Sequence, residues 1–234
     1  MILCLETATP LCSVALCDSS GVISIKESSE GKSHASLLTL FIIELLNEAG
    51  IKAGDLEAIA VSKGPGSYTG LRIGVSTAKG IAYAASVPLI GLETTFSMFH
   101  GFFSTAKSKY GAAGGDLFCP MLDARRMEVY YALFDSEGRT VRGIRAEIID
   151  KTSFSDIPLS HRIFFFGDGS VKCRNEITRE NVVFSDDFRI SASYMQQPAY
   201  AAFREHRFED VAYFEPFYLK DFLISKPAKN VLRK

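Results

Sequence analysis

Short apolar runs alternate with longer segments of helical periodicity along this chain, which is typical of a mixed α/β protein. The chain opens with three strand-like apolar runs, at residues 2–5, 13–17 and 22–26. A helix is predicted over 33–49, because Ser33 can cap its first turn and Gly50 can end it. The pattern therefore predicts a three-strand meander followed by a helical crossover.

A glycine-rich loop follows the next apolar run. Residues 58–61 predict a buried strand, and the segment 63–74 reads Lys-Gly-Pro-Gly-Ser-Tyr-Thr-Gly-Leu-Arg-Ile-Gly before a helix that ends near Ala85. Helix N-termini attract anions, and glycines let the backbone approach a ligand closely. The spacing is not that of a P-loop, although Glu93 keeps a dinucleotide site formally open. The loop predicts either a ligand-binding loop or a tight structural turn.

The second half of the chain repeats the first. Leu122 and Gly138 each lie 117 positions after their counterparts Leu5 and Gly21, and six identities recur in this register, which also aligns Glu6 with Asp123. The glycine loop is echoed by Gly-Asp-Gly-Ser at 167–170, after another apolar strand. Two similarities in the same order and setting indicate two similar lobes.

The repeat predicts the domain organisation. We expect a first lobe at 1–104, a connection at 105–116, where apolar periodicity gives way to Ser, Ala, Gly and Lys, and a second lobe at 117–225. Residues 226–234 contain four cations and no acid, which predicts a basic, solvated tail.

Composition and charge limit the possible functions. The chain has 234 residues, 47% of them hydrophobic and 23% charged, as in an ordinary soluble globular protein. A formal net charge of −1 does not favour strong, autonomous nucleic-acid binding. Five cysteines without a C-x-x-C pair indicate reduced core thiols. Because neither a signal peptide nor an apolar stretch of about twenty residues is found, we expect a cytoplasmic protein.

Several landmarks together resemble a known family. Two lobes that each begin with an acid on a strand-turn-strand and carry a later glycine loop resemble the actin, hexokinase and sugar-kinase superfamily. More narrowly, the chain resembles the glycoprotease-like TsaB (YeaZ) family in four segments: Leu5-Glu-Thr-Ala-Thr9 with Cys12-Ser-Val-Ala-Leu16, the loop Gly64–Gly74, Leu122-Asp-Ala-Arg125 with Glu128-Val-Tyr130, and Glu215-Pro-Phe-Tyr-Leu219. The resemblance implies an α/β fold of two actin-like, ribonuclease H-like lobes, each a mixed sheet with helices.

The resemblance also implies a function. It implies a noncatalytic bacterial subunit required to make threonylcarbamoyl-adenosine beside the anticodon of tRNA. In that family the paralogue TsaD carries the metal and performs the transfer, the small ATPase TsaE joins the complex, and TsaB also forms homodimers. The tRNA is then expected to bind mainly through the partner. No cofactor is expected in the isolated chain, and ATP or ADP is a candidate ligand at the contact with TsaD.

Enzymatic alternatives remain. A small-molecule kinase or ATP hydrolase would use the cleft between the lobes, and a glycoprotease-like metallopeptidase is less favoured because only His100 stands where that class has an H-x-x-x-H pair. The family usually has Asp where this chain has Glu6, which favours a site without catalysis. The candidates for a vestigial or weak nucleotide site are Glu6, Thr7, Ser13, Gly64, Gly66, Ser67, Arg72 and Asp123.

A helix pair is the candidate partner surface. The helix at 33–49 carries apolar residues in nearly every direction, whereas a helix that covers one side of a sheet needs only a stripe. The helix after the loop offers small residues that allow close helix approach. The alternative is that both helices are buried within the chain. We expect the interface to include Leu37, Leu38, Phe41, Ile42, Leu45, Gly74, Ala78 and Ala82.

Overall fold

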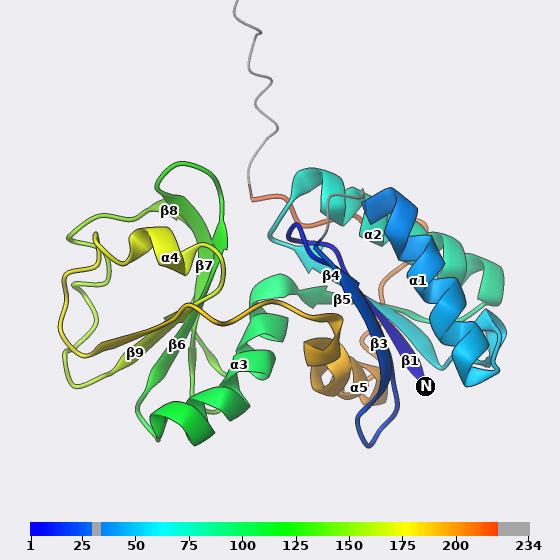
Figure 1. Ribbon diagram of the computed structural model, residues 1–234, viewed down its shortest axis with the longest axis horizontal. Helices are drawn as coiled ribbons and strands as arrows, with labels where there is room; N and C mark the ends of the chain where they lie inside the picture. Colours follow the sequence, from blue (N-terminus) through cyan, green and yellow to red (C-terminus); the bar gives the residue numbers. More distant parts are fainter. Residues whose placement is uncertain (30–33, 220–234) are drawn as a thin grey trace, which may run out of the picture.

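Two five-stranded mixed sheets form the centres of two lobes in the computed structural model, which describes residues 1–29 and 34–219 (Figure 1). The first sheet has the order β3-β2-β1-β4-β5, and the second, read from its β8 edge, has the order β8-β7-β6-β9-β10. In each sheet three antiparallel strands are followed by parallel strands on the far side of the first. The predicted fold class, two similar lobes with mixed sheets and helices, is confirmed.

The first sheet has helices on both faces. Its strands are β1 (Ile2–Glu6), β2 (Cys12–Cys17), β3 (Val22–Ser28), β4 (Ala58–Gly64) and β5 (Leu89–Glu93). One face is covered by α1 (His34–Ala49), the short η1 (Ala53–Asp55) and α2 (Tyr68–Ala85). Every residue of β1 and β2 is buried, because the sheet centre is covered from both sides.

The second sheet has one long helix on one face and mostly turns on the other. Its strands are β6 (Leu117–Asp123), β7 (Glu128–Asp135), β8 (Thr140–Ile148), β9 (Ile163–Phe166) and β10 (Val182–Ser185). Helix α3 (Thr94–Tyr110) packs a phenylalanine-rich layer against one face. The opposite face carries the four-residue α4 (Ser170–Cys173) and side chains from turns such as Phe154 and Ile157.

The predicted connection at 105–116 starts inside a helix. Helix α3 continues to Tyr110 and ends at Gly111, which has a left-handed φ of 60°. The Ser and Lys residues that suggested a linker lie on the exposed side of α3, while Ala106 is fully buried. The polar residues at 104–109 therefore form the outer face of an amphipathic helix and not a linker.

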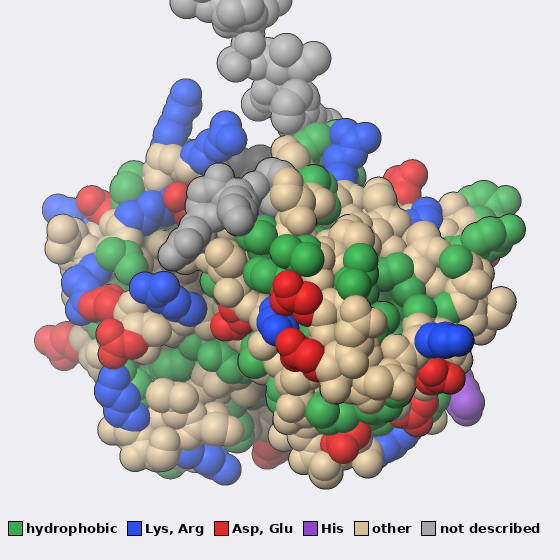
Figure 2. Space-filling view, turned by 45° about the vertical axis from the view of Figure 1, so that its right-hand side comes forward, with side chains coloured by type: hydrophobic (Ala, Val, Ile, Leu, Met, Phe, Trp, Pro, Cys, Tyr) green, Lys and Arg blue, Asp and Glu red, His purple; other side chains and the backbone are tan. Residues whose placement is uncertain are grey.

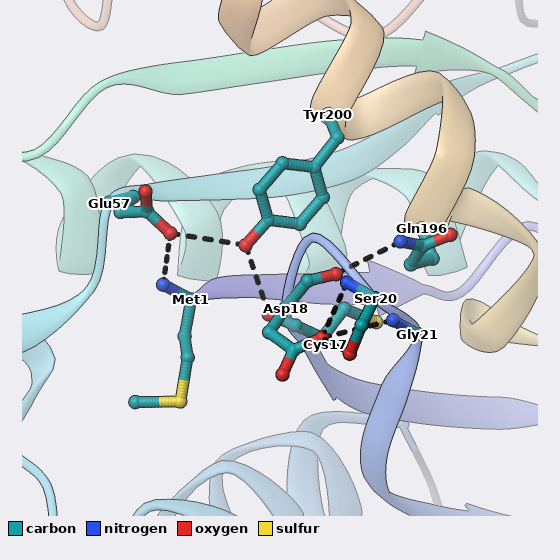
Figure 3. Close-up of polar contacts among 8 residues, drawn as sticks. All are labelled: Met1, Cys17, Asp18, Ser20, Gly21, Glu57, Gln196 and Tyr200. Atoms are coloured by element: carbon teal, nitrogen blue, oxygen red, sulfur yellow. Dashed lines mark hydrogen bonds and ion pairs between the residues drawn. The ribbon is translucent and has the colours of Figure 1, made fainter.

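The chain returns to the first lobe after β10. The short η2 (Ala192–Met195) and α5 (Gln196–Arg204) cover the second face of the first sheet. Figure 3 shows how α5 is attached: the Tyr200 hydroxyl donates to the Glu57 carboxylate at 3.1 Å, and the Gln196 amide donates to the Asp18 carbonyl at 2.9 Å. Part of the sequence range expected to form the second lobe therefore completes the first.

An extended C-terminal strap, residues 208–219, then runs along the first lobe beside α2. The Glu209 N–H donates to the Leu89 carbonyl at 2.8 Å, Phe214 enters the core, and the Phe217 N–H donates to the Lys63 carbonyl at 2.6 Å. The predicted basic tail at 226–234 lies outside the described residues. Within residues 1–29 and 34–219, no helix is both long and apolar enough to cross a membrane, and all five cysteines are buried and free.

Candidate functional site in the cleft between the lobes

A cavity of about 510 Å³ lies between the two lobes. The first lobe contributes the turn after β1 and the glycine loop, the second contributes the turn after β6, and the end of the strap closes one side. The lining consists of residues 8–10, 65–69, 122–125, 130, 168 and 217–219. Cavities of this size accommodate small ligands, and residues 65–69 of the predicted glycine loop line this one.

Contacts inside the chain explain the glycines of this loop. A methyl group at Gly66 would lie 2.5 Å from the Ala8 carbonyl oxygen, and one at Gly64 would lie 2.6 Å from the Phe217 oxygen. At Gly70 the methyl group would lie 2.1 Å from the carbonyl oxygen of Thr7. The loop is thus held against the β1 turn and the strap, which favours the structural interpretation of its glycines. Ser67 caps α2 by accepting a hydrogen bond from the Gly70 N–H at 3.2 Å.

Glu6 lies behind the cavity wall rather than on it. Its fully buried carboxyl group accepts hydrogen bonds from the Ser62 hydroxyl and from the Ala8 N–H. No cation pairs with it among the described residues. Burial outweighs these hydrogen bonds and raises the pKa of Glu6 to about 7. A carboxyl group enclosed in this way cannot touch a ligand in the cleft without rearrangement of the β1 turn.

Two other predicted site residues also serve the interior. The Ser13 hydroxyl donates to the Glu27 carboxylate at 2.6 Å and accepts from the Ala192 N–H at 2.8 Å, so it joins the first sheet to the returning chain. Thr7 is fully buried, and its hydroxyl has no hydrogen-bond partner within the described part of the chain. A methyl group at Gly74 would lie 2.3 Å from that hydroxyl, so Thr7 faces α2 and not the cavity.

Asp123 is the predicted acid that does reach the cavity. It forms an ion pair with Lys172, and its carboxylate accepts a hydrogen bond from the Arg125 N–H at 2.8 Å. Asp168, from the glycine echo of the second lobe, accepts from the Asp123 N–H at 3.2 Å. Desolvation raises the pKa of Asp168, and the nearby Asp123 charge acts in the same direction. Asp168 lies within the repeated Gly167–Ser170 loop, but the sequence pattern did not identify it as a site residue.

The internal repeat is displaced by one residue between the first strands of the two lobes. Leu5 pairs with Val14 in the first sheet, whereas Tyr131, which the repeat aligns with Val14, pairs with Met121. Leu5 faces the layer of α1 and α2, and Met121 faces the equivalent layer of turns in the second lobe. Leu122, which the sequence aligned with Leu5, points to the opposite face, toward α3.

This displacement separates the two acids that the repeat aligns. Thr7, not Glu6, is the structural counterpart of Asp123. Glu6 is fully buried inside the first lobe, whereas the side chain of Asp123 is 48% exposed and lines the cavity. The two acids therefore do not meet across the cleft.

Arg72 lies one turn into α2, beside Tyr68, which lines the cavity. Its guanidinium lies 5.2 Å from the centre of the Tyr68 ring, and Nη1 donates to the Tyr68 hydroxyl at 3.2 Å. Tyr68 in turn lies beside Tyr218 of the strap, with ring centres 4.9 Å apart. This aromatic pair was not selected from the sequence, because its members are 150 residues apart and meet only through the strap.

Most of the predicted partner-interface residues face the interior of the first lobe, so this prediction needs correction. Seven of the eight residues are buried: Leu37, Leu38, Ile42, Leu45, Gly74, Ala78 and Ala82; Phe41 is partly buried. The three leucines and Ile42 follow one helical stripe, which is the stripe that α1 needs to cover its own sheet. The small residues of α2 likewise allow the sheet to approach.

A second apolar face nevertheless exists on these helices. Leu40 and Ile43 of α1 are 46% and 52% exposed, and Tyr83 of α2 is 81% exposed. Helices α1 and α2 lie side by side on the first sheet (Figure 1). The outer apolar face that the sequence predicted is therefore present, but different residues form it.

Comparison with known proteins identifies the family. A family model described as "TsaD: tRNA N6-adenosine threonylcarbamoyltransferase" matches residues 23–222. The tRNA threonylcarbamoyladenosine biosynthesis protein TsaB of Escherichia coli is 35% identical over 136 residues, which are 58% of this chain and 55% of that protein. The chain belongs to the TsaB (YeaZ) family. The protein of the same name from Haemophilus influenzae is 27% identical over 231 residues and matches 94% of this chain and 93% of its own length.

Solved structures support the fold of this TsaB-family chain. The structure "YeaZ from Pseudomonas aeruginosa" superimposes with a TM-score of 0.77 at 24% identity, covering 93% of this chain and 99% of that one. A second Pseudomonas aeruginosa structure, described as similar to peptidase YEAZ, gives a TM-score of 0.79 at 23% identity. Among the described residues, no group of three or more His, Cys, Asp or Glu side chains is placed to hold a metal ion.

Proposed function

We propose that this chain is a noncatalytic partner and activator of a TsaD-type transferase, which forms threonylcarbamoyl-adenosine beside the anticodon of tRNA. The names of its curated relatives support the pathway. The transferase provides the main contact with tRNA, and a TsaE-type ATPase joins through the complex. In isolation the chain forms a homodimer through the same face that contacts the transferase.

The outer face of α1 and α2 carries this proposal. Leu40 and Ile43 project from one helix and Tyr83 from the next. Large apolar side chains that gather on an exposed face usually mark a contact with another protein. The side of α1 and α2 that faces the sheet is already filled by the first lobe's own core, so these three side chains do not serve the fold.

The cleft supports a role without catalysis. Glu6 is enclosed by Ser62 and the β1 turn, and Asp123 is paired with Lys172. A phosphoryl-transfer site places its acids and loops around the transferred group, whereas here the loop glycines hold parts of the chain together. We therefore place any ATP or ADP at the contact with the transferase. The kinase or ATP hydrolase alternative would require nucleotide turnover by the isolated chain.

Reconstitution tests the proposal directly. Purified TsaC-type, TsaD-type and TsaE-type proteins are incubated with tRNA, ATP, bicarbonate and labelled threonine, with and without this chain. We expect label in tRNA to depend on the chain and to fall at least tenfold with the double variant Leu40→Glu, Ile43→Glu. Modification that proceeds equally well without the chain would contradict the proposal.

A matched control separates contact from folding. Val171, in the second lobe, is 55% exposed, so Val171→Glu adds a charge at a comparable surface site away from α1. This variant is expected to keep full activity and to remain dimeric in sedimentation velocity. The α1 double variant is expected to sediment as a folded monomer.

A further inference from the structure

We propose that the mouth of the interlobe cleft binds single-stranded RNA directly, through arginines on the second lobe and a tyrosine pair on the first. The inference rests on the proposed function, since that function brings an RNA substrate to the complex. It adds a contact by this chain to the main contact made by the transferase.

Two exposed arginines form the tip of the turn between β6 and β7. Arg125 and Arg126 have φ values of 71° and 52°, and their side chains make no hydrogen bond or ion pair with the described residues. Positive φ is uncommon and strained for residues other than Gly, Asn and Asp. The chain therefore holds two positive charges at the rim of the cleft in a backbone conformation that does not favour arginine.

An aromatic surface lies on the other side of the cleft. The rings of Tyr68 and Tyr218 lie 4.9 Å apart, and the Arg72 guanidinium is 5.2 Å from the Tyr68 ring. Tyr218 is 39% exposed and lines the cavity together with Tyr68 and Arg125. Proteins bind single-stranded nucleic acid by stacking bases on aromatic rings and placing cations along the backbone. Both components are present at this rim.

The positive charge at the rim comes from three arginines. Arg72, Arg125 and Arg126 are all exposed, so their guanidinium groups are open to a ligand in solution. Figure 2 shows Lys and Arg side chains projecting at the upper left and upper right of the molecule.

Acids also lie near the cleft. Asp123 forms an ion pair with Lys172, and the other acids near the three arginines are Glu128, Asp168 and Glu215. An acidic protein could also be attracted to such a rim, but it would not need stacked tyrosine rings beside the cations. The apolar face of α1 and α2 already provides a separate surface for a protein partner.

Direct binding to a simple RNA tests the proposal. Fluorescence anisotropy of a labelled twelve-nucleotide oligouridine is measured with the whole chain at 50 and 200 mM KCl. We expect binding at 50 mM that weakens with salt. The double variant Arg125→Asn, Arg126→Asn should bind about tenfold more weakly, with a salt slope smaller by about 1.4, since each phosphate contact on a single strand contributes about 0.7. Asn tolerates positive φ, so this variant should fold normally.

Two further variants complete the test. Tyr218→Leu is expected to weaken binding about tenfold without changing the salt slope, because it removes stacking and no charge. The control Arg139→Asn, Arg207→Asn removes the same charge from arginines already paired with Asp135 and Glu205, and should change affinity less than twofold.

Three outcomes would overturn the RNA contact. These are no RNA binding at 50 mM KCl, equal weakening by the cleft and control arginine pairs, or loss of transferase binding by the cleft variant while its RNA affinity stays unchanged. The last result would assign the rim to a protein. Any of them leaves the proposed function standing if reconstituted modification still requires the chain.

Discussion

The two lobes share a sheet but differ in the layer that covers it. In both sheets a three-strand meander is followed by parallel strands beside its first strand. On the same face of that sheet the first lobe has α1 with 16 residues and α2 with 18, whereas the second has α4 with four. The second lobe covers its sheet with turns instead. Among the described residues, the first lobe therefore has a broad helical layer on this face and the second lobe does not.

The difference extends to the acids at the ends of the first strands. In the first lobe Glu6 is enclosed, while in the second Asp123 is half exposed and paired. A one-residue difference in the connection to the second strand changes which face each side chain occupies. The lobes thus preserve topology while losing the symmetry of side chains that a two-acid site would need.

The strongest test of this comparison contrasts the two faces of α1. Leu45 is fully buried and Ile43 is 52% exposed. We expect Leu45→Glu to destabilise the fold by more than about 4 kcal/mol, because it places a charge in an apolar core. Ile43→Glu should change the free energy of unfolding by less than about 1 kcal/mol and affect association instead. Urea unfolding monitored by circular dichroism measures both, and similar losses for the two variants would contradict the assignment of faces.

The second-largest effect that we expect is a pH dependence of the free energy of unfolding, caused by the buried Glu6. Since the pKa of Glu6 is raised to about 7 by burial, the folded state retains a proton that the unfolded state releases from about pH 4.5 upward. Stability should therefore fall by about 3 kcal/mol as the pH rises from 4.5 to 7 and beyond. Glu6→Gln should remove this part of the pH dependence. Urea unfolding of both proteins at pH 5 and pH 8 gives the difference, and identical pH dependences would show that Glu6 does not cause it.

The glycines of α2 provide a smaller and more local test. A methyl group at Gly70 would meet the Thr7 carbonyl oxygen at 2.1 Å, whereas none of the described atoms beyond its own helix lies within 4 Å of one at Gly80. We expect Gly70→Ala to cost about 2 kcal/mol by displacing the β1 turn. Gly80→Ala should stabilise by about 0.5 to 1 kcal/mol, because alanine has the higher helix propensity. Thermal unfolding separates the two, and equal shifts of both variants would refute the packing role of the loop.

Sequence periodicity predicts the sheets better than the site because each level depends on different information. Local sequence patterns and the pairing rules of strands were enough to predict the strands at 2–5 and 58–61 and the repeat in the second half. The prediction of the interface residues was wrong for most of them, because periodicity shows that α1 has two apolar faces but does not show which face meets the sheet. The Tyr68–Tyr218 pair forms only after the strap crosses the lobe, and no local pattern reports such a meeting.

We expect the smallest effect on stability from the ion pair of Asp123 in the second lobe. Lys172 and Asp123 form an ion pair whose side chains are 22% and 48% exposed, and partly exposed pairs contribute little because water and salt screen them. Lys172→Met preserves the apolar stem and should change the free energy of unfolding by less than about 1 kcal/mol. Unfolding in urea at 50 and 500 mM NaCl is the measurement. A loss of more than about 2 kcal/mol in the free energy of unfolding would mean that the ion pair of Asp123 is important for the stability of the fold. The contrast between the buried Glu6 of the first lobe and the exposed Asp123 of the second would then not hold.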